Sequence, residues 1–124
     1  MVNKRLLIVE DNKLFRESMI FALQKYFKVD ACGNYYAALE FIQKNRYDLI
    51  ITDGAFPQSG DFEVYNPKDE DYRGNLIAPI AKKLGIQIIG VSSEPRRLIG
   101  FKYVFQKPVD VLELINFIQK ELKI

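Results

Sequence analysis

Short apolar runs alternate along the chain with stretches whose apolar residues recur at helical spacing. The run at residues 6–9 is bounded by charged residues, which is typical of a buried strand. In the next stretch, residues 12–27, large apolar residues lie about four positions apart, the period of an amphipathic helix. Parallel strands need a long crossover, usually a helix. The alternation therefore predicts an α/β domain with a parallel sheet and helices on both faces.

The same alternation continues to the end of the chain. Strands are predicted at residues 6–9, 28–32, 49–52, 86–91 and 103–105. Helices are predicted at residues 12–27, 35–44 and 76–84, and the last helix begins at a capping box formed by Asp110 and Glu113. Tyr26 is expected on the buried face of the first helix, and Cys32 in the core. A length of 124 residues suits one domain, residues 1–124.

The composition excludes several classes of function. Apolar residues make up 48% of the chain and charged residues 27%, and the net charge is +2. This balance does not favour binding to nucleic acid or to a membrane. The apolar runs are too short to span a bilayer, and the single cysteine suits a reducing cytoplasm. We therefore expect a cytoplasmic protein.

The chain contains no histidine. This excludes Ser-His-Asp and Cys-His catalysis, and with one cysteine it leaves almost no basis for a zinc site. The available chemistry is that of carboxylates, lysines, hydroxyls and a metal bound by oxygen atoms.

Polar residues follow the predicted strands where these end. They are Glu10, Asp11, Asp53, Ser92 and Lys107. The carboxyl ends of parallel strands meet at one edge of the sheet, where ligands bind. Two unit charges about 4 Å apart repel by ~4 kcal/mol near a protein surface, and Mg²⁺ would offset this repulsion between carboxylates. The pattern predicts a phosphoryl-transfer site with a carboxylate nucleophile.

Each of these residues also has a purely structural interpretation. Glu10, Asp11 or Asn12 can cap the first helix, and Asp53 can be a solvated loop acid. Ser92 can be a loop hydroxyl, and Lys107 can mark a strand exit before proline. These interpretations explain any one residue better than all five together. Arg96 and Arg97 are expected to be solvated charges.

Four segments resemble the receiver domains of two-component response regulators. They are "LLIVEDN", "DLIITDGAFP", "IIGVSS" and "YVFQKP", and the resemblance extends over essentially the whole chain. It implies a flavodoxin-like, doubly wound five-stranded sheet in the order 2-1-3-4-5. It also implies that Asp53 receives a phosphoryl group from a histidine kinase or a histidine phosphotransfer protein.

The resemblance implies roles for the remaining site residues. Asp11, Asp53 and the backbone carbonyl of Ala55 would bind Mg²⁺ directly, and Glu10 would bind it through water. Lys107 would pair with the phosphoryl group, and its bond to Pro108 would be cis. Ser92 would turn toward the phosphoryl oxygen.

The functional expectation is a single-domain receiver that signals through protein contacts. It would not be an enzyme, although it would assist its own phosphorylation and dephosphorylation. It would act as a monomer or weak dimer on a downstream protein, without contacting nucleic acid or a membrane. One alternative is a receiver-like interaction module that takes no phosphate. Another is an aspartyl-phosphate-type hydrolase, but Ala55 stands where such an enzyme has its second acid.

The sequence departs from the family in three places. Asp53 and Ser92 are separated by 38 residues, an excess that corresponds to an acidic insert at residues 59–75. Only 14 residues separate Ser92 from Lys107, too few for a full fourth helix. A single turn or loop is therefore predicted at residues 95–99. Val104 replaces the aromatic residue of the family's switch, and strand alternation points Tyr103 to the other face.

These departures suggest a different output surface. Signalling is expected through the insert and the rim around Asp53. That insert is interpreted either as a solvated loop or as a specificity element beside the site. Phe56 and Phe62 are expected to supply apolar contacts there.

Overall fold

The structure is a computed structural model that describes residues 4–60 and 72–124. Most of the acidic insert, including Phe62, lies outside the described residues. The strands are β1 (Arg5–Val9), β2 (Lys28–Cys32), β3 (Leu49–Asp53), β4 (Gln87–Ser92) and β5 (Tyr103–Gln106). The helices are α1 (Lys13–Leu23), α2 (Tyr35–Lys44), α3 (Gly74–Leu84) and α4 (Val111–Lys120), and a 3₁₀ turn, η2, covers Pro95–Arg97.

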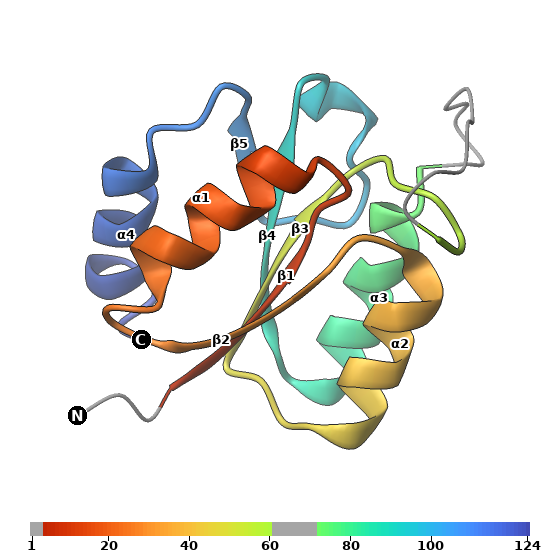
Figure 1. Cartoon of the computed structure of the whole chain (residues 1–124), viewed down its shortest axis with the longest axis horizontal. Helices are drawn as coiled ribbons and strands as arrows, with labels where there is room; N and C mark the ends of the chain where they lie inside the picture. Colours follow the sequence, from red (N-terminus) through yellow and green to blue (C-terminus); the bar gives the residue numbers. More distant parts are fainter. Residues whose placement is uncertain (1–3, 61–71) are drawn as a thin grey trace.

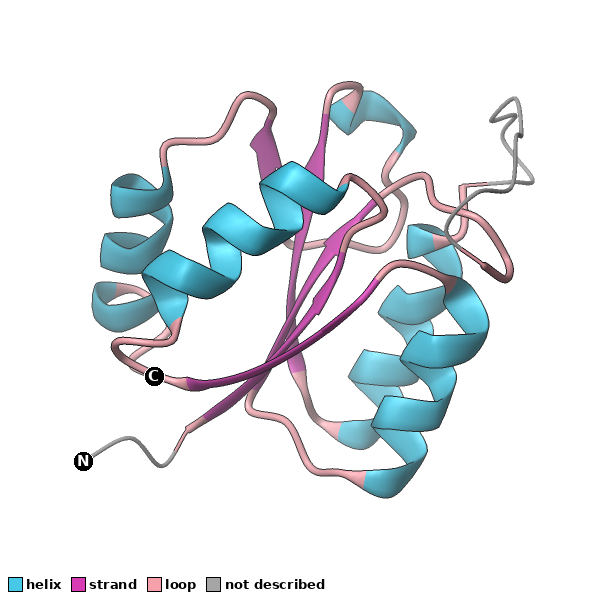
Figure 2. Ribbon diagram, in the orientation of Figure 1, coloured by secondary structure: helices cyan, strands magenta, loops and turns pink. Residues whose placement is uncertain are grey.

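The five strands form one parallel sheet in the order β2-β1-β3-β4-β5. Figure 1 shows α1 and α4 on one face of this sheet, and α2 and α3 on the other. The predicted fold class and strand order are confirmed. The carboxyl ends of the strands lie toward the top of Figure 2, and the loops that follow them gather there.

The two faces of the sheet build two apolar cores. Leu6 and Ile8 pack with the α1 and α4 side, while Leu7 and Val9 pack with the α2 and α3 side. All four side chains are at most 1% exposed. A strand covered on both faces reads as a continuous apolar run, which explains why residues 6–9 show no alternation.

Side chains cap the starts of α1, α2 and α4. Asn12 Oδ1 accepts a hydrogen bond from Phe15 N–H at 2.9 Å, and Asn34 Oδ1 accepts one from Ala37 N–H at 2.8 Å. Asp110 Oδ1 accepts the N–H groups of Leu112 and Glu113. Each bond satisfies a backbone donor that the first turn of a helix leaves without a partner.

Helix α1 is shorter than the predicted helix at residues 12–27. It ends at Leu23, and the chain turns so that Phe27 becomes buried just before β2 begins at Lys28. Tyr26 is consequently 46% exposed, and its predicted place on the buried face is wrong.

Phe56 lies in the core and does not contribute to a contact surface. Its side chain has no exposed area and packs in the α2 and α3 core. The expectation that Phe56 supplies contacts at the rim is therefore wrong.

The connection between β4 and β5 contains one 3₁₀ turn in place of a crossover helix, as predicted. Leu98 and Phe101 cover the sheet there, and they lie so close to Gly90 that a larger residue would overlap them. The absence of a side chain at Gly90 therefore lets this short connection lie flat on the strand.

The last strand alternates as expected. Tyr103 packs edge-on against Phe117 of α4, with ring centroids 5.1 Å apart, while Val104 is 44% exposed. The Lys107–Pro108 bond that follows β5 is cis, which confirms the implication of the resemblance.

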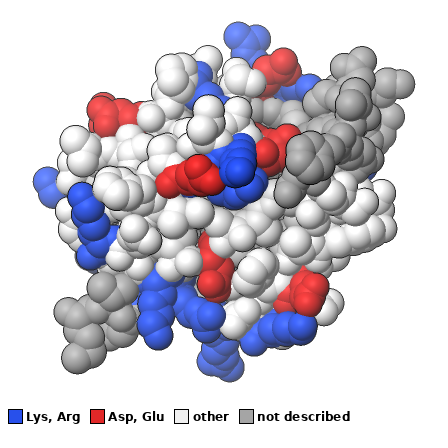
Figure 3. Space-filling view, viewed as in Figure 1, with Lys and Arg blue, Asp and Glu red and all other residues white. Residues whose placement is uncertain are grey.

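Among the described residues, no helix has the length and apolar character needed to cross a membrane. On the face viewed in Figure 3, charged side chains of both signs lie among uncharged ones.

Candidate functional site

Three carboxylates meet where β1 and β3 end. The two strands are neighbours with Val9 opposite Thr52, so Glu10 and Asp53 leave them side by side. Carboxylate oxygens of Glu10, Asp11 and Asp53 all lie within 4.8 Å of one another. Glu10 is 2% exposed and Asp53 is 9% exposed, so two of the three acids are buried.

Lys107 joins two of these acids. Its Nζ lies 2.8 Å from Glu10 Oε1 and 3.3 Å from Asp53 Oδ2. Its backbone N–H donates to the carbonyl of Ser92 at 2.9 Å, which continues the β4–β5 ladder by one residue. The register of the sheet thus places Lys107 across the site from the carboxylates.

Backbone groups hold the acids in place. Asp53 Oδ1 accepts the N–H of Gly54 at 2.7 Å, and Glu10 Oε2 accepts the N–H of Asn12 at 3.0 Å. Because Asn12 caps α1 with its own side chain, neither Glu10 nor Asp11 is needed for that role. The capping interpretation therefore applies to Asn12 and leaves both acids available to the site.

Burial makes the charge of this cluster costly. Burial and the neighbouring Glu10 raise the pKa of Asp53 to about 8, against the opposing effect of Lys107. Burial also raises the pKa of Glu10, although Lys107 counteracts it. Burial alone would lower the pKa of Lys107, but Asp53 and Glu10 together outweigh it and raise that pKa. One lysine therefore compensates the acids only in part.

The donor set fits a hard divalent cation. All the ligands are oxygen atoms, two of the acids are buried, and their excess negative charge is only partly neutralised by Lys107. Mg²⁺ accepts one or two carboxylates and keeps several waters. Ala55 lines the same cavity as Asp53.

Ser92 is buried at the end of β4, and Tyr72 covers it. The Tyr72 hydroxyl forms a hydrogen bond with Ser92 Oγ, which also accepts the N–H of Glu94 at 2.9 Å. The Tyr72 ring lies directly against Gly54, the residue after Asp53. Tyr72 is not among the predicted site residues, because it lies at the end of the insert and belongs to no periodic pattern.

Arg97 was expected to be solvated, and that expectation is wrong. Its guanidinium carbon lies 4.3 Å from the centroid of the Tyr72 ring, within the range of a cation–π contact. Arg97 and Tyr72 line a small cavity of about 130 Å³. The other residues that line it are Asp53, Ala55, Ser92, Ser93, Glu94 and Lys107.

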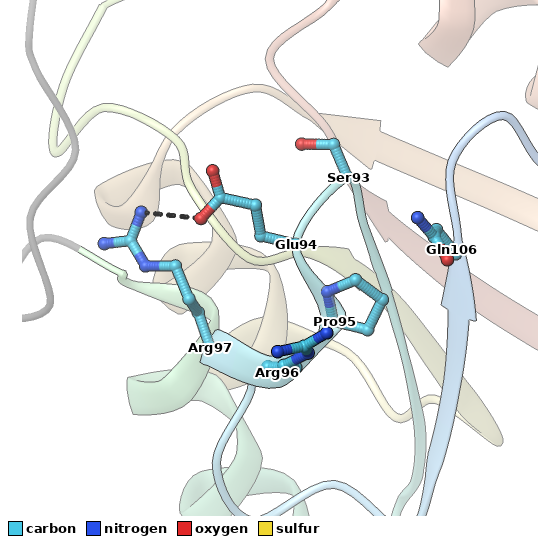
Figure 4. Close-up of a pocket in the computed structure, with 6 residues that line it drawn as sticks. All are labelled: Ser93, Glu94, Pro95, Arg96, Arg97 and Gln106. Carbon is cyan, nitrogen blue, oxygen red and sulfur yellow. Dashed lines mark hydrogen bonds and ion pairs between the residues drawn. The ribbon is translucent and has the colours of Figure 1, made fainter.

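A larger surface hollow of about 650 Å³ lies beside this cavity, and Figure 4 shows its lining residues. It is formed by η2 and its neighbours, together with Gln106 from β5. None of the three clustered acids lines it.

Comparisons with known proteins agree on one family. Residues 6–66 match the model of the response regulator receiver domain. The chain is 30% identical, over 96% of its length, to hybrid signal transduction histidine kinase B of Dictyostelium discoideum, of which it spans 7%. The receiver domain of the Francisella response regulator 1452 superposes with a TM-score of 0.75 at 20% identity, with 98% of each chain covered.

A further solved structure is response regulator TrrA of Thermotoga maritima in complex with Mg²⁺-BeF. It has a TM-score of 0.73 at 22% identity, with 95% of this chain and 98% of that chain covered. At these identities the two structures establish the fold.

Residues 6–66 thus match the receiver domain family of response regulators, and the fold of solved receiver domains extends over nearly the whole chain. Two-component signalling and phosphorelay are the processes in which receiver domains act.

Proposed function

We propose that residues 1–124 form one receiver domain that accepts a phosphoryl group on Asp53 and signals through protein contacts. The observation that carries this proposal is the buried arrangement of Asp53, Glu10 and Lys107. It places a carboxylate 3.3 Å from a lysine ammonium, beside a cavity of about 130 Å³. A carboxylate in such surroundings can act as a nucleophile toward phosphorus.

The proposed reaction is the transfer of a phosphoryl group from phosphohistidine. An oxygen of Asp53 forms a bond to phosphorus as the P–N bond breaks, and the electron pair returns to the imidazole nitrogen, which takes up a proton. The product is an acyl phosphate on Asp53. In this proposal Lys107 Nζ pairs with the new phosphoryl oxygens, and the Ser92 side chain turns so that its hydroxyl donates a hydrogen bond to one of them.

We further propose Mg²⁺ as the metal of this site. Asp11, Asp53 and the carbonyl oxygen of Ala55 would hold it directly, and Glu10 would hold it through water. When bound, Mg²⁺ supplies positive charge that offsets the carboxylates and the phosphoryl oxygens.

The partners we propose are a histidine kinase or a histidine phosphotransfer protein as donor, and a downstream protein as target. We place the protein in the cytoplasm, as a monomer or weak dimer that assists its own phosphorylation but turns over no substrate. The hydrolase alternative has less support, because Ala55 carries no acid two residues after Asp53. The role of the acidic insert concerns residues mostly outside the described part of the chain.

Incubation with Mg²⁺ and acetyl phosphate is expected to add one phosphoryl group to the protein, measured as a shift in intact mass. Asp53→Asn should abolish the shift, because an amide is not a nucleophile of this kind. Asp48→Asn, which changes an acid at the opposite end of the sheet, should keep it. A labelled Asp53→Asn protein would contradict the assignment, and an unlabelled wild type would favour the interaction module that takes no phosphate.

Mg²⁺ is expected to raise the melting temperature of the unphosphorylated protein. A ligand at one hundred times its Kd stabilises the folded state by about 2.7 kcal/mol. Asp11→Ala should remove most of this gain, because it deletes a proposed direct ligand. Glu40→Ala on α2 should respond to Mg²⁺ as the wild type does, because Glu40 pairs with Lys44 away from the site. Identical responses of wild type and Asp11→Ala would place the metal elsewhere.

A further inference from the structure

Tyr72 fills the space between the backbone beside Asp53 and the hydroxyl of Ser92. It is 5% exposed, and its ring lies so close to Gly54 that a side chain at that position would overlap it. Its hydroxyl is hydrogen-bonded to Ser92 Oγ. One aromatic residue therefore contacts two parts of the proposed phosphorylation site.

The Ser92 hydroxyl already has its partners in this structure. Its oxygen accepts the N–H of Glu94 at 2.9 Å and shares a hydrogen bond with Tyr72. Turning the Ser92 side chain toward a phosphoryl oxygen on Asp53 moves its oxygen away from Tyr72. The bond to Tyr72 and a bond to a phosphoryl group therefore compete for the same side chain.

The Tyr72 ring also contacts a residue of η2. The Arg97 guanidinium carbon lies 4.3 Å from the ring centroid. In Figure 4 the Arg97 side chain is turned toward Glu94, with Nη1 3.4 Å from Oε2. A change in the position of the ring would therefore act on a side chain of the 3₁₀ turn.

Asn75, in the first turn of α3, ties the same turn to the helix. Its Nδ2 donates to the carbonyl of Arg97 at 2.9 Å, and its Oδ1 accepts the N–H of Ile99 at 2.8 Å. Ile99 is 71% exposed. A chain of contacts therefore leads from the site to the surface. The Tyr72 ring contacts Arg97, and Arg97 and Ile99 are hydrogen-bonded to Asn75 at the start of α3.

We infer that Tyr72 is a positioning residue that holds Ser92 in the unphosphorylated protein and couples phosphorylation of Asp53 to the position of residues 95–99. The inference rests on the proposed phosphorylation of Asp53. When Ser92 turns to the phosphoryl group, the buried Tyr72 hydroxyl loses its bond to Ser92 and keeps only the long bond that it donates to the carbonyl of Glu94, at 3.5 Å, which is unfavourable. The ring then moves, and Arg97 carries the change to the 3₁₀ turn and the hollow beside it.

Tyr72→Phe tests the inference, because it removes the hydroxyl and keeps the ring in contact with Gly54 and Arg97. Beryllofluoride with Mg²⁺ serves as the phosphoryl mimic, titrated by amide NMR. The variant is expected to bind it about fivefold more tightly, because no Tyr72–Ser92 bond has to be broken. Without any ligand, the amide resonances of residues 94–99 should already shift toward their positions in the saturated wild type.

Two further variants separate the steps of the coupling. Tyr26→Phe removes a half-exposed hydroxyl on a surface turn and should behave as the wild type. Arg97→Gln keeps the Tyr72–Ser92 bond, so Ser92 should still respond to the mimic while the response of residues 95–99 weakens. If Tyr72 had only a structural role, Arg97→Gln would not weaken the response of residues 95–99 to the mimic.

The outcomes are distinct. A wild type that responds to beryllofluoride, with a Tyr72→Phe variant of equal affinity and unshifted amides at residues 94–99, would overturn the inference alone. An undiminished response of residues 95–99 in Arg97→Gln would also overturn the coupling route. A wild type that neither responds to beryllofluoride nor gains a phosphoryl group would overturn the proposed function, and the inference with it.

Discussion

Lys107→Met is expected to lower the free energy of unfolding of the metal-free protein by about 2 kcal/mol at about pH 8. The substitution keeps the aliphatic stem but removes the ammonium shared by Glu10 and Asp53. Breaking a fully buried ion pair costs about 3–5 kcal/mol, and we reduce this figure because the Lys107 side chain is 25% exposed. Urea unfolding followed by circular dichroism measures the change.

The loss of stability should depend on pH in a definite direction. The pKa of Asp53 is about 8 in the folded protein, against an ordinary value of 3.8, so the folded state holds more protons between these two values. The contribution of Asp53 to stability therefore falls as the pH rises from about 4 to about 8. Lys107 lowers the pKa of Asp53, so Lys107→Met should extend this fall to pH values above about 8 without making it steeper, because Asp53 binds at most one proton.

Lys44→Met provides the matched control. Lys44 pairs with Glu40 at 2.7 Å on the surface of α2, and both side chains are at least 65% exposed. Water screens an exposed pair at this spacing, so it contributes little to stability. Equal effects of the two substitutions, or a Lys107→Met effect that does not grow between about pH 7 and pH 9, would contradict the stabilisation of the ionised acids by Lys107.

Gly74→Ala is expected to destabilise the protein by about 3 kcal/mol and to slow phosphorylation of Asp53. The N–H of Gly74 donates to the carbonyl of Gly54 at 2.9 Å, so the start of α3 rests on the chain beside Asp53. A Cβ at this position would overlap the carbonyl oxygen of Asp53. Because that atom belongs to the backbone, the overlap can be relieved only by moving the backbone of Asp53, the proposed nucleophile, or the start of α3.

Gly85→Ala separates this effect from ordinary backbone strain. Gly85 ends α3 at a φ of 71°, where a Cβ would have no neighbour within 4 Å. Its replacement should cost about 1 kcal/mol and leave phosphorylation unchanged. Denaturant unfolding and intact mass after acetyl phosphate give both readouts. If Gly74→Ala and Gly85→Ala had the same effects on stability and on phosphorylation, the contact between Gly74 and Asp53 would not matter for function.

The sequence predicted best those features that depend on local pattern. Residues 6–9 and 49–52 could be assigned as strands because both faces of each strand are buried. Glu10, Asp53 and Lys107 follow strands, and parallel strands bring their carboxyl ends to one edge whatever the details of packing. The prediction that these side chains lie together therefore needed only the fold class.

Features that depend on contacts between distant segments could not be predicted. The short end of α1 follows from the need to bury Phe27 and enter β2, which overrides the helical spacing of Tyr26. Tyr72 lies at the end of the insert and Arg97 in the β4–β5 connection, so their contact joins two segments that are distant in the sequence. Neither residue belongs to a periodic apolar pattern. Phe56 looks like an exposed loop residue in the sequence, yet the loop after β3 turns it into the core.

The position of Lys107 has a consequence for the dynamics of the site. Lys107 follows β5, which lies at the edge of the sheet and has a strand neighbour on one side only. Beside β5, the Leu98 and Phe101 side chains of the β4–β5 connection cover Gly90, in the place of a crossover helix. Fraying of this edge would withdraw the ammonium from the carboxylates without unwinding any helix. The fraction of time that the ammonium spends beside Asp53 is therefore governed by a local unfolding equilibrium as well as by rotation of the lysine side chain.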